Sequence, residues 1–263
     1  MKIAVLVKYV PDATGARTFA ADGTVDRVAA DGLLCELDEY AVEQALRIAD
    51  EADDSDEVEV VAMTLGPEEA ADALKRSLQM GASAGIHIID DAVHGSDVLA
   101  TSAILAAAVR KAAPDLVICG MASTDGAMGV LPAMLSERLS WPGLTFAATL
   151  SVHDQTVSIR RDGDTASLTV EASLPAVVSV TDQSGEARYP SMRGILAAKK
   201  KPVQTWALDD LGVDPASVGL ASAATTVLQV TPRPPKEPGR VVADKQGAGA
   251  AALLDFLSAG KYI

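Results

Sequence analysis

The chain has 263 residues and a net charge of −14, and its 49% of apolar residues include few aromatics. This length suits one large domain, or one domain with an appendage, with a core of small aliphatic side chains. The acidic balance argues against nucleic-acid binding, and two distant cysteines with three scattered histidines form neither a disulfide framework nor a metal site.

The first predicted element is an apolar run at residues 2–7, typical of a parallel strand buried on both faces. The run is too short to span a bilayer, and no signal-peptide cleavage site follows it. We therefore expect a cytoplasmic protein without membrane insertion. Further along, residues 36–59 hold eleven acids and one base, Arg47, and predict a solvated helix face and loop.

Strand-like and helix-like patterns then alternate. Apolar runs of strand length recur at residues 58–63, 86–89, 115–119 and 176–180. Helical periodicity marks residues 41–49, 68–81 and 96–113, with Ser96 as the expected N-cap of the last helix. Another helix is expected to begin near 129–131, because Pro132 fits a first turn. This alternation predicts an α/β fold, an open and mostly parallel sheet with helices on both faces.

Other patterns follow residue 150. The sequence TVSIRRDGDTASLTVEA predicts a β-hairpin laid on the α/β core. Beyond 205 the sheet pattern fades, four prolines in 231–239 predict a stiff linker, and residues 251–263 predict a short amphipathic helix without a core of its own. We expect an α/β domain at 1–205 and a C-terminal arm at 206–263.

Three predicted strand ends could line one cleft, since ligands of open α/β sheets bind beyond the carboxyl ends of the strands. The loop in 119–139 is the most informative: its glycines permit close backbone approach, and the helix start after them offers free N–H groups to a phosphate. The other two ends are 34–39 and 64–69. The spacing matches neither a Walker A loop nor G-x-G-x-x-G, so a phosphate-bearing ligand and a plain connection both stay open.

No catalytic set is recognisable. The chain lacks a nucleophile elbow, a zinc-protease motif and a carboxylate pair at a telling spacing. Lys8, at the end of the first strand, could pair with a phosphate or with a neighbouring carboxylate. We therefore expect a protein without catalytic residues of its own.

Residues 186–203, EARYPSMRGILAAKKKPV, set five basic residues among large apolar ones. A nucleic-acid patch conflicts with the acidic balance, and a membrane contact would need an apolar face of helical length that the segment lacks. The remaining interpretation is a segment that docks another protein, and we call it the docking segment.

Several blocks of the sequence resemble the electron transfer flavoprotein β subunit. The stretch 170–203 is similar to the signature of that family, with LPAVV, the RY pair and the KKKP ending. KYVPD, DEYAVEQALRI, ALKRSLQMGAS, the D-G hairpin and FLSAGKYI also resemble the family in order and spacing. The resemblance implies an adenine-nucleotide α-hydrolase-like fold and a heterodimer whose α subunit carries most contacts to FAD.

The resemblance also implies what this chain contributes: a scaffold, an AMP site and the docking of partners. The implied partners are acyl-CoA and other flavin dehydrogenases, as in fatty acid oxidation, and a quinone reductase that receives the electrons from FAD. The implied docking residues are the anchor Met192 with Tyr189, Ile195, Lys199, Lys200 and Lys201. At Arg160 or Arg161 relatives often carry Glu that reaches toward the α subunit, so that ion pair with the α subunit is not carried over to this chain.

The implied AMP contacts come from the strand ends described above. They are Leu6, Lys8, Cys35, Glu36, Leu37, Asp38, Thr64, Leu65, Gly66, Gly120, Met121, Ala122, Ser123, Thr124, Asp125, Gly126, Ala127, Met128, Gly129, Val130 and Leu131. Many relatives carry other side chains at Ala122, Ala127 and Val130, so the implied contacts at these positions rest on backbone groups.

Two other functions stay open. A bifurcating relative would bind a second FAD in place of AMP in the same cleft. A free-standing nucleotide-binding enzyme or sensor would be stable alone and act on ATP. The Pro-rich linker and the C-terminal helix favour a subunit, since they are typical of an arm that wraps another chain.

Overall fold

The computed structural model describes residues 1–15, 18–27, 29–53, 57–231, 234, 239–244 and 247–263. The chain divides into two units, Met1–Gln229 and Val230–Ile263. The division expected from the sequence is an α/β domain at 1–205 and a C-terminal arm at 206–263. It concerns the roles of the two segments and stays a prediction.

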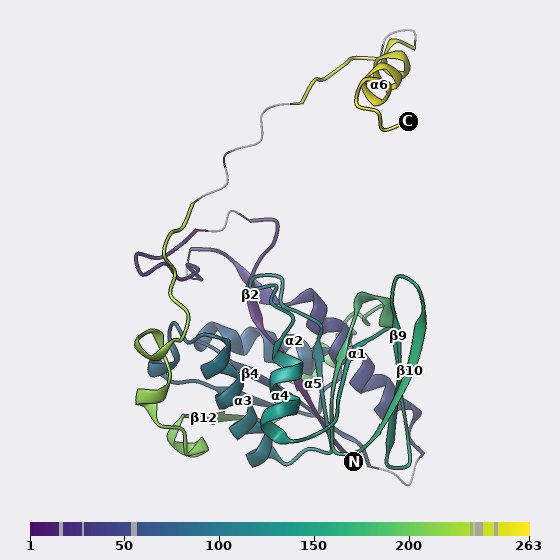
Figure 1. Cartoon of the computed structure of the whole chain (residues 1–263). Coiled ribbons are helices and arrows are strands. Elements are labelled where there is room, and N and C mark those ends of the chain that lie inside the picture. The colour runs from purple at the N-terminus through teal and green to yellow at the C-terminus, as the bar shows by residue number, and fades with distance from the viewer. Residues whose placement is uncertain (16–17, 28, 54–56, 232–233, 235–238, 245–246) are drawn as a thin grey trace. The chain divides into compact units, whose positions relative to one another are not determined.

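A seven-stranded parallel sheet forms the centre of the first unit (Figure 1). Every pair of neighbouring strands runs in parallel, so the predicted α/β fold is confirmed. In spatial order the strands are β12 (Val203–Trp206), β5 (Ala84–Ile88), β4 (Glu59–Leu65), β1 (Lys2–Leu6), β6 (Leu116–Gly120), β11 (Ala176–Val180) and β7 (Gly143–Ala147).

Helices pack on both faces of this sheet. One core joins α1 (Glu36–Glu51) and α2 (Ala71–Met80) to Ile3 and Val5 of β1. The other joins α3 (Val98–Ala112) and α4 (Leu131–Leu139) to Ala4 and Leu6. Because successive strand residues point to opposite faces, the continuous apolar run of β1 serves both cores.

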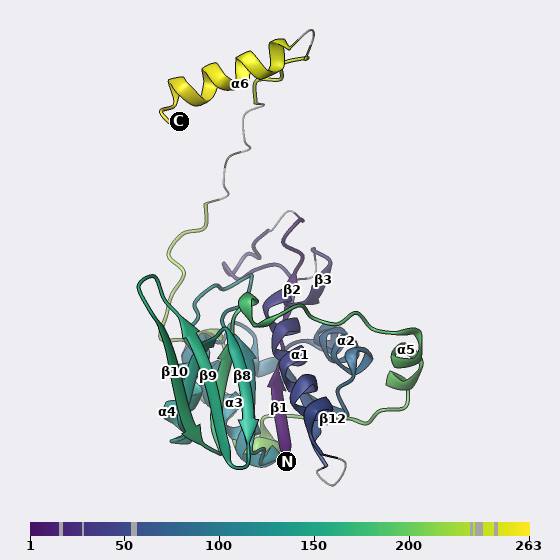
Figure 2. The same cartoon turned by 90° about the vertical axis from the view of Figure 1, so that its right-hand side faces the viewer.

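A three-stranded antiparallel sheet lies on the α1 side, as Figure 2 shows, and confirms the predicted hairpin. It consists of β8 (Thr149–His153), β9 (Thr156–Asp162) and β10 (Ser167–Ser173). The smaller elements are the pair β2 (Tyr9–Pro11) and β3 (Gly32–Leu34), helix α5 (Met192–Ala198), and the 3-10 turns η1 (Glu68–Ala70), η2 (Asp91–Val93), η3 (Asp182–Ser184), η4 (Asp209–Leu211), η5 (Pro215–Ser217) and η6 (Leu220–Ser222).

The N-cap of α3 differs from the prediction. Asp97, and not Ser96, accepts hydrogen bonds from the N–H groups of Leu99 and Ala100, at 3.0 and 3.1 Å. An N-cap side chain bonds to an N–H two or three residues ahead, and the helix begins at residue 98. The Ser96 hydroxyl instead accepts the N–H of Gly219 at 2.8 Å.

The acidic stretch 36–59 is not solvated throughout, so that prediction is wrong for two of its members. Asp38 and Glu43 of α1 are buried. Each has found partners far away in the sequence, which no local pattern of charges reveals. These contacts are described below.

The sheet and its core extend further along the chain than the pattern of the sequence predicts. Trp206 ends the edge strand β12, and it packs with Leu208 and Val218 into the core beside α3. A strand at 203–206 was not predicted, because the stretch is short and follows three lysines and a proline.

The second unit contains α6 (Ala248–Ala259), which confirms the predicted C-terminal helix with an earlier start. None of its residues is buried, and Leu253, Leu254 and Phe256 are exposed. Most of the predicted linker 231–239 lies outside the described residues. No helix in the described part of the chain is long and apolar enough to cross a membrane.

Candidate functional site

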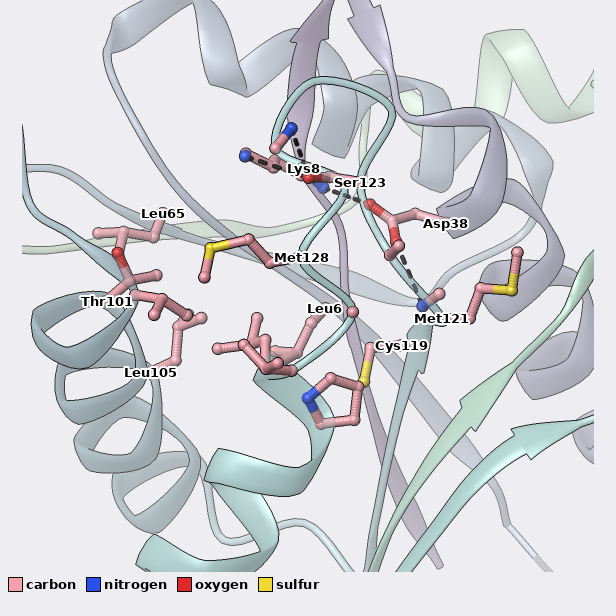
Figure 3. Close-up of a pocket in the computed structure, with 18 of the residues that line it drawn as sticks. Leu6, Lys8, Asp38, Leu65, Thr101, Leu105, Cys119, Met121, Ser123 and Met128 are labelled. Atoms are coloured by element: carbon pink, nitrogen blue, oxygen red, sulfur yellow. Dashed lines mark hydrogen bonds between the residues drawn. The ribbon is translucent and has the colours of Figure 1, made fainter. Parts of the chain in front are cut away.

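A cavity of about 380 Å³ opens where β1, β4 and β6 end and where α3 and α4 begin (Figure 3). Parallel strands present their carboxyl ends at one edge of the sheet, so three segments distant in the sequence meet there. The N-terminal residues of α3 and α4, Asp97 to Val98 and Val130 to Pro132, complete the rim.

The walls of the cavity are mainly apolar. The side chains of Leu65, Leu105 and Met128 face a common space, with Leu6 and Cys119 beside it (Figure 3). Such a wall suits a flat, largely apolar ring system, for which a few polar groups fix the orientation.

Asp38 ties the base of the cavity together. Its carboxylate accepts the N–H of Lys8 at 2.8 Å and the N–H of Gly120 at 3.2 Å, which joins the ends of β1 and β6 to the start of α1. Burial raises the pKa of Asp38 to about 7, although the two N–H groups and the Lys8 charge act in the opposite direction.

A charged cluster stands at the mouth. The Lys8 ammonium lies 2.8 Å from one oxygen of Asp125, and the Arg27 guanidinium lies 2.6 Å from the other. The Asp125 side chain is only 3% exposed. Burial alone would raise its pKa, but the Lys8 charge and the hydrogen bonds from both cations hold that pKa below its usual value.

Unpaired backbone donors also belong to the cavity lining, at the start of α4. The N-cap of α4, Val130, provides no side-chain acceptor, and Pro132 occupies the first turn as predicted. Within the described residues, the N–H groups of Gly129, Val130 and Leu131 have no acceptor. Free N–H groups at a helix start, together with the helix dipole and an ammonium group, form a binding place for an anion such as a phosphate.

The structure brings most of the predicted site residues together. The cavity is lined by Leu6, Lys8, Asp38, Leu65, Gly120, Met121, Ala122, Ser123, Gly126, Met128, Gly129, Val130 and Leu131. The remaining predicted positions are not part of the lining: Cys35, Glu36, Leu37, Thr64, Gly66, Thr124, Asp125 and Ala127.

Two of the predicted positions outside the lining, Cys35 and Thr64, lie behind the cavity wall and on the opposite face of the sheet. The Cys35 thiol lies 3.9 Å from the carbonyl oxygen of Ala122, directly behind the loop. Thr64 alternates along β4 with the lining residues Met63 and Leu65 and therefore points to the opposite face. Its hydroxyl is buried without a hydrogen-bond partner among the described residues.

Sequence reasoning missed the α3 side of the cavity. Additional lining residues are Val7, Met63, Ser96, Asp97, Val98, Thr101, Leu105, Cys119, Pro132 and Thr225. The rule applied to the other strand ends could have found those of α3, because this helix begins after β5 at the same edge of the sheet.

The docking segment contains the short helix α5, which the sequence analysis did not predict. Ser191 caps it by accepting the N–H of Gly194 at 3.0 Å. Tyr189 and Met192 are 88% and 75% exposed, whereas Ile195 is half-buried. Leu196, one turn after Met192 and 60% exposed, is a large apolar group that the predicted docking residues do not include.

The predicted lysines of the docking segment differ in their surroundings. Lys199 and Lys200 are exposed. The Lys201 ammonium donates hydrogen bonds to the carbonyl oxygens of Leu78 and Gly81, at 2.8 and 3.0 Å, and so caps the end of α2. Lys201 therefore holds the segment to its own subunit.

Two other features concern the chemistry of the chain. Both cysteines are free and buried. Among the described residues, no group of three or more His, Cys, Asp and Glu side chains is arranged to hold a metal ion.

Comparisons with known proteins point in one direction. The model of the electron transfer flavoprotein domain matches residues 22–211. The chain is 44% identical to "Electron transfer flavoprotein subunit beta" of Mycobacterium tuberculosis, over 99% of both chains. It is 31% identical to "Caffeyl-CoA reductase-Etf complex subunit CarD" of Acetobacterium woodii, over 92% of both, and 30% identical to the Clostridium acetobutylicum subunit beta, over 100% of both.

Proposed function

Because this chain belongs to the electron transfer flavoprotein family, as one of its β subunits, we propose that it holds AMP in the cavity at the strand ends. As a β subunit it has an α subunit as its partner, and the family works with a flavin. We further propose that the α subunit carries the FAD and that the docking segment receives the dehydrogenases.

The observation that carries the AMP proposal is that one cavity combines an apolar wall with groups that can bind an anion. The apolar side chains of Leu65, Leu105 and Met128 suit an adenine ring. The free N–H groups at the start of α4 and the Lys8 ammonium, both in the cavity lining, suit a phosphate. A mononucleotide has one group of each kind.

The size of the cavity supports a mononucleotide. A volume of about 380 Å³ is near the lower end of the range for small-molecule sites, about 300 to 1,000 Å³. In the proposed heterodimer FAD lies with the α subunit, and AMP occupies the cavity of this chain.

Docking is the second part of the proposal. The exposed Met192 and Tyr189 would enter an apolar site on acyl-CoA and other flavin dehydrogenases, with Lys199 and Lys200 facing acidic groups. Electrons then pass through the FAD of the heterodimer to a quinone reductase. This chain contributes binding and orientation to that transfer.

Nucleotide extraction from the purified αβ heterodimer tests the AMP proposal. We expect one AMP and one FAD per heterodimer. Two FAD molecules without AMP would favour the bifurcating alternative, in which FAD occupies the same cleft. A chain that purifies without an α subunit and hydrolyses ATP would favour the free-standing enzyme.

Met192→Asp tests docking in the same preparation. We expect the KM of the heterodimer as electron acceptor for an acyl-CoA dehydrogenase to rise at least about tenfold, because a charge would have to enter an apolar site. An unchanged KM would refute the docking role. Leu168→Asp, which alters an exposed apolar residue of β10 outside the docking segment, is the control.

A further inference from the structure

The docking segment is held at its beginning by one residue, Arg188. After β11 the chain crosses α1 and reaches α5, which packs beside α2 (Figure 2). At this crossing the side chain of Arg188 contacts Glu43 of α1, and the next residue in the chain is the exposed Tyr189. The docking function proposed above gives Arg188 no role.

We propose that Arg188, clamped by Glu43 and Asp50 of α1, is a positioning residue that holds Tyr189 and Met192 in the arrangement a partner dehydrogenase binds. This inference rests on the docking role of the segment. It makes the acidic face of α1 part of the docking machinery.

The clamp uses both the side chain and the backbone of Arg188. Its Nε and one terminal nitrogen lie 2.7 and 3.1 Å from the two carboxylate oxygens of Glu43 and form a bidentate ion pair. The backbone N–H of Arg188 donates to the same carboxylate at 3.0 Å. The other contact of the guanidinium is with Asp50, at 2.8 Å. Because backbone and side chain are both bound, the direction of the chain at this point is set.

Burial makes this clamp hard to open. The Glu43 side chain is 9% exposed, and opening would leave its charge buried without a partner. Most surface ion pairs lack this property, since water replaces the partner at little cost. On the same helix, the pair of Arg47 and Glu51 is exposed and 4.0 Å long, and it provides a natural comparison.

The next residue, Tyr189, is oriented from α2. The Arg76 guanidinium lies over the Tyr189 ring at 6.0 Å. Arg76 is itself held by Glu39 of α1, with 3.0 Å between Nε and the carboxylate oxygen. The ring is therefore supported on one side while most of its surface stays exposed.

The far end of the segment is fixed as well. A Cβ at Gly194 would lie 2.5 Å from the carbonyl oxygen of Gln79, so α5 approaches the end of α2 as closely as a glycine allows. The Lys201 ammonium caps the same end of α2 through Leu78 and Gly81. Met192 thus projects from a segment held at both ends.

Such an arrangement lowers the entropy that is lost on binding. Side chains already held in the bound arrangement need not be ordered when the partner arrives. Without the clamp, Tyr189 and Met192 would have to be ordered at that moment. We expect this to weaken docking about tenfold and to leave electron transfer within the docked complex nearly unchanged.

The test compares Glu43→Gln with the control Glu51→Gln in the FAD-containing heterodimer. An acyl-CoA dehydrogenase reduced by its acyl-CoA serves as the electron donor, and the heterodimer concentration is varied. For Glu43→Gln we expect the KM for the heterodimer to rise about tenfold at nearly constant kcat. Trypsin should also cut faster after Arg193 and Lys199, because the segment opens more often. Glu51→Gln should match the unchanged protein in both assays.

A second variant covers the case in which Glu43→Gln does not fold. Arg188→Lys keeps the positive charge but cannot form the bidentate pair, so the KM for the heterodimer should rise less than for Glu43→Gln. The FAD and nucleotide contents of the variants should remain those of the unchanged protein, because the clamp lies outside the cavity.

The outcomes separate this inference from the docking role itself. If Met192→Asp raises the KM but Glu43→Gln and Arg188→Lys leave both KM and trypsin cleavage unchanged, the clamp has no positioning role. If a clamp variant lowers kcat while KM stays constant, positioning for docking is also refuted. If Met192→Asp has no effect on KM, the docking role fails and the inference fails with it.

Discussion

Gly120→Ala should damage the junction at the base of the cavity that we propose as the AMP site. Gly120 ends β6, and its N–H donates to Asp38. An added Cβ would lie 2.6 Å from the Asp38 carboxylate and 2.8 Å from the carbonyl group of Leu37. Leu37 is in the first turn of α1, so its backbone can yield only if the helix moves.

The expected loss of stability follows from these distances. Forcing a methyl group into a well-packed site costs about 1 to 3 kcal/mol. For a unit of this size each kcal/mol lowers Tm by about 2 to 4 °C, so Tm should fall by about 2 to 12 °C. Because the junction forms part of the cavity wall, the AMP content of the heterodimer should fall with it.

The assay is thermal unfolding of the heterodimer, followed by circular dichroism, together with nucleotide extraction. Gly126→Ala in the same loop is the matched control. Its Cβ would meet only the Ser123 hydroxyl at 3.3 Å and the Lys8 ammonium at 3.9 Å, both side-chain ends. We expect its Tm to change by less than about 2 °C. A Gly120→Ala protein with the Tm of the control and the AMP content of the unchanged protein would refute the argument.

Three more predictions follow from the same site. Asp38 holds its proton in the folded protein up to about pH 7, whereas the unfolded chain loses it near 3.8, so its contribution to stability is lost as pH rises through 7. From pH 4 to 8 the unfolding free energy of Asp38→Asn should therefore gain about 4 kcal/mol relative to the unchanged protein in urea titrations. Lys8→Met should weaken AMP binding at least about tenfold in calorimetry, as the proposed charged contact to the phosphate is lost, while Lys2→Met at the other end of β1 should not. Asp97→Ala removes the N-cap of α3 and should lower Tm by about 2 to 4 °C, and an unchanged Tm would show that the cap contributes nothing.

The elements that the sequence predicted well are those with a local signal. The runs 2–7 and 176–180 consist almost entirely of apolar residues, which is the pattern of a strand buried on both faces. The loop after β6 could be placed at a ligand cleft for the same reason, because its glycines and Pro132 mark a strand end followed by a helix start.

Signals that depend on partners far away in the sequence were not recognised. Glu43 belongs to an acidic run and pairs with Arg188, 145 residues later. Thr101 and Leu105 of α3 turn toward the cavity because of the position of their helix on the sheet. Strand β12 is defined by its pairing with β5 rather than by its own short sequence.

Sequence by itself determined the parallel α/β sheet, the hairpin, the site of the cavity loop and the family, since each of these is written in periodicity or in motifs of neighbouring residues. The tertiary structure decided which charges are buried and what meets at the strand ends. It also showed that the docking segment contains the short helix α5 and contacts both α1 and α2. Packing brings together groups that the chain separates by a hundred residues, and burial then determines whether an acid lies in water or holds another segment in place.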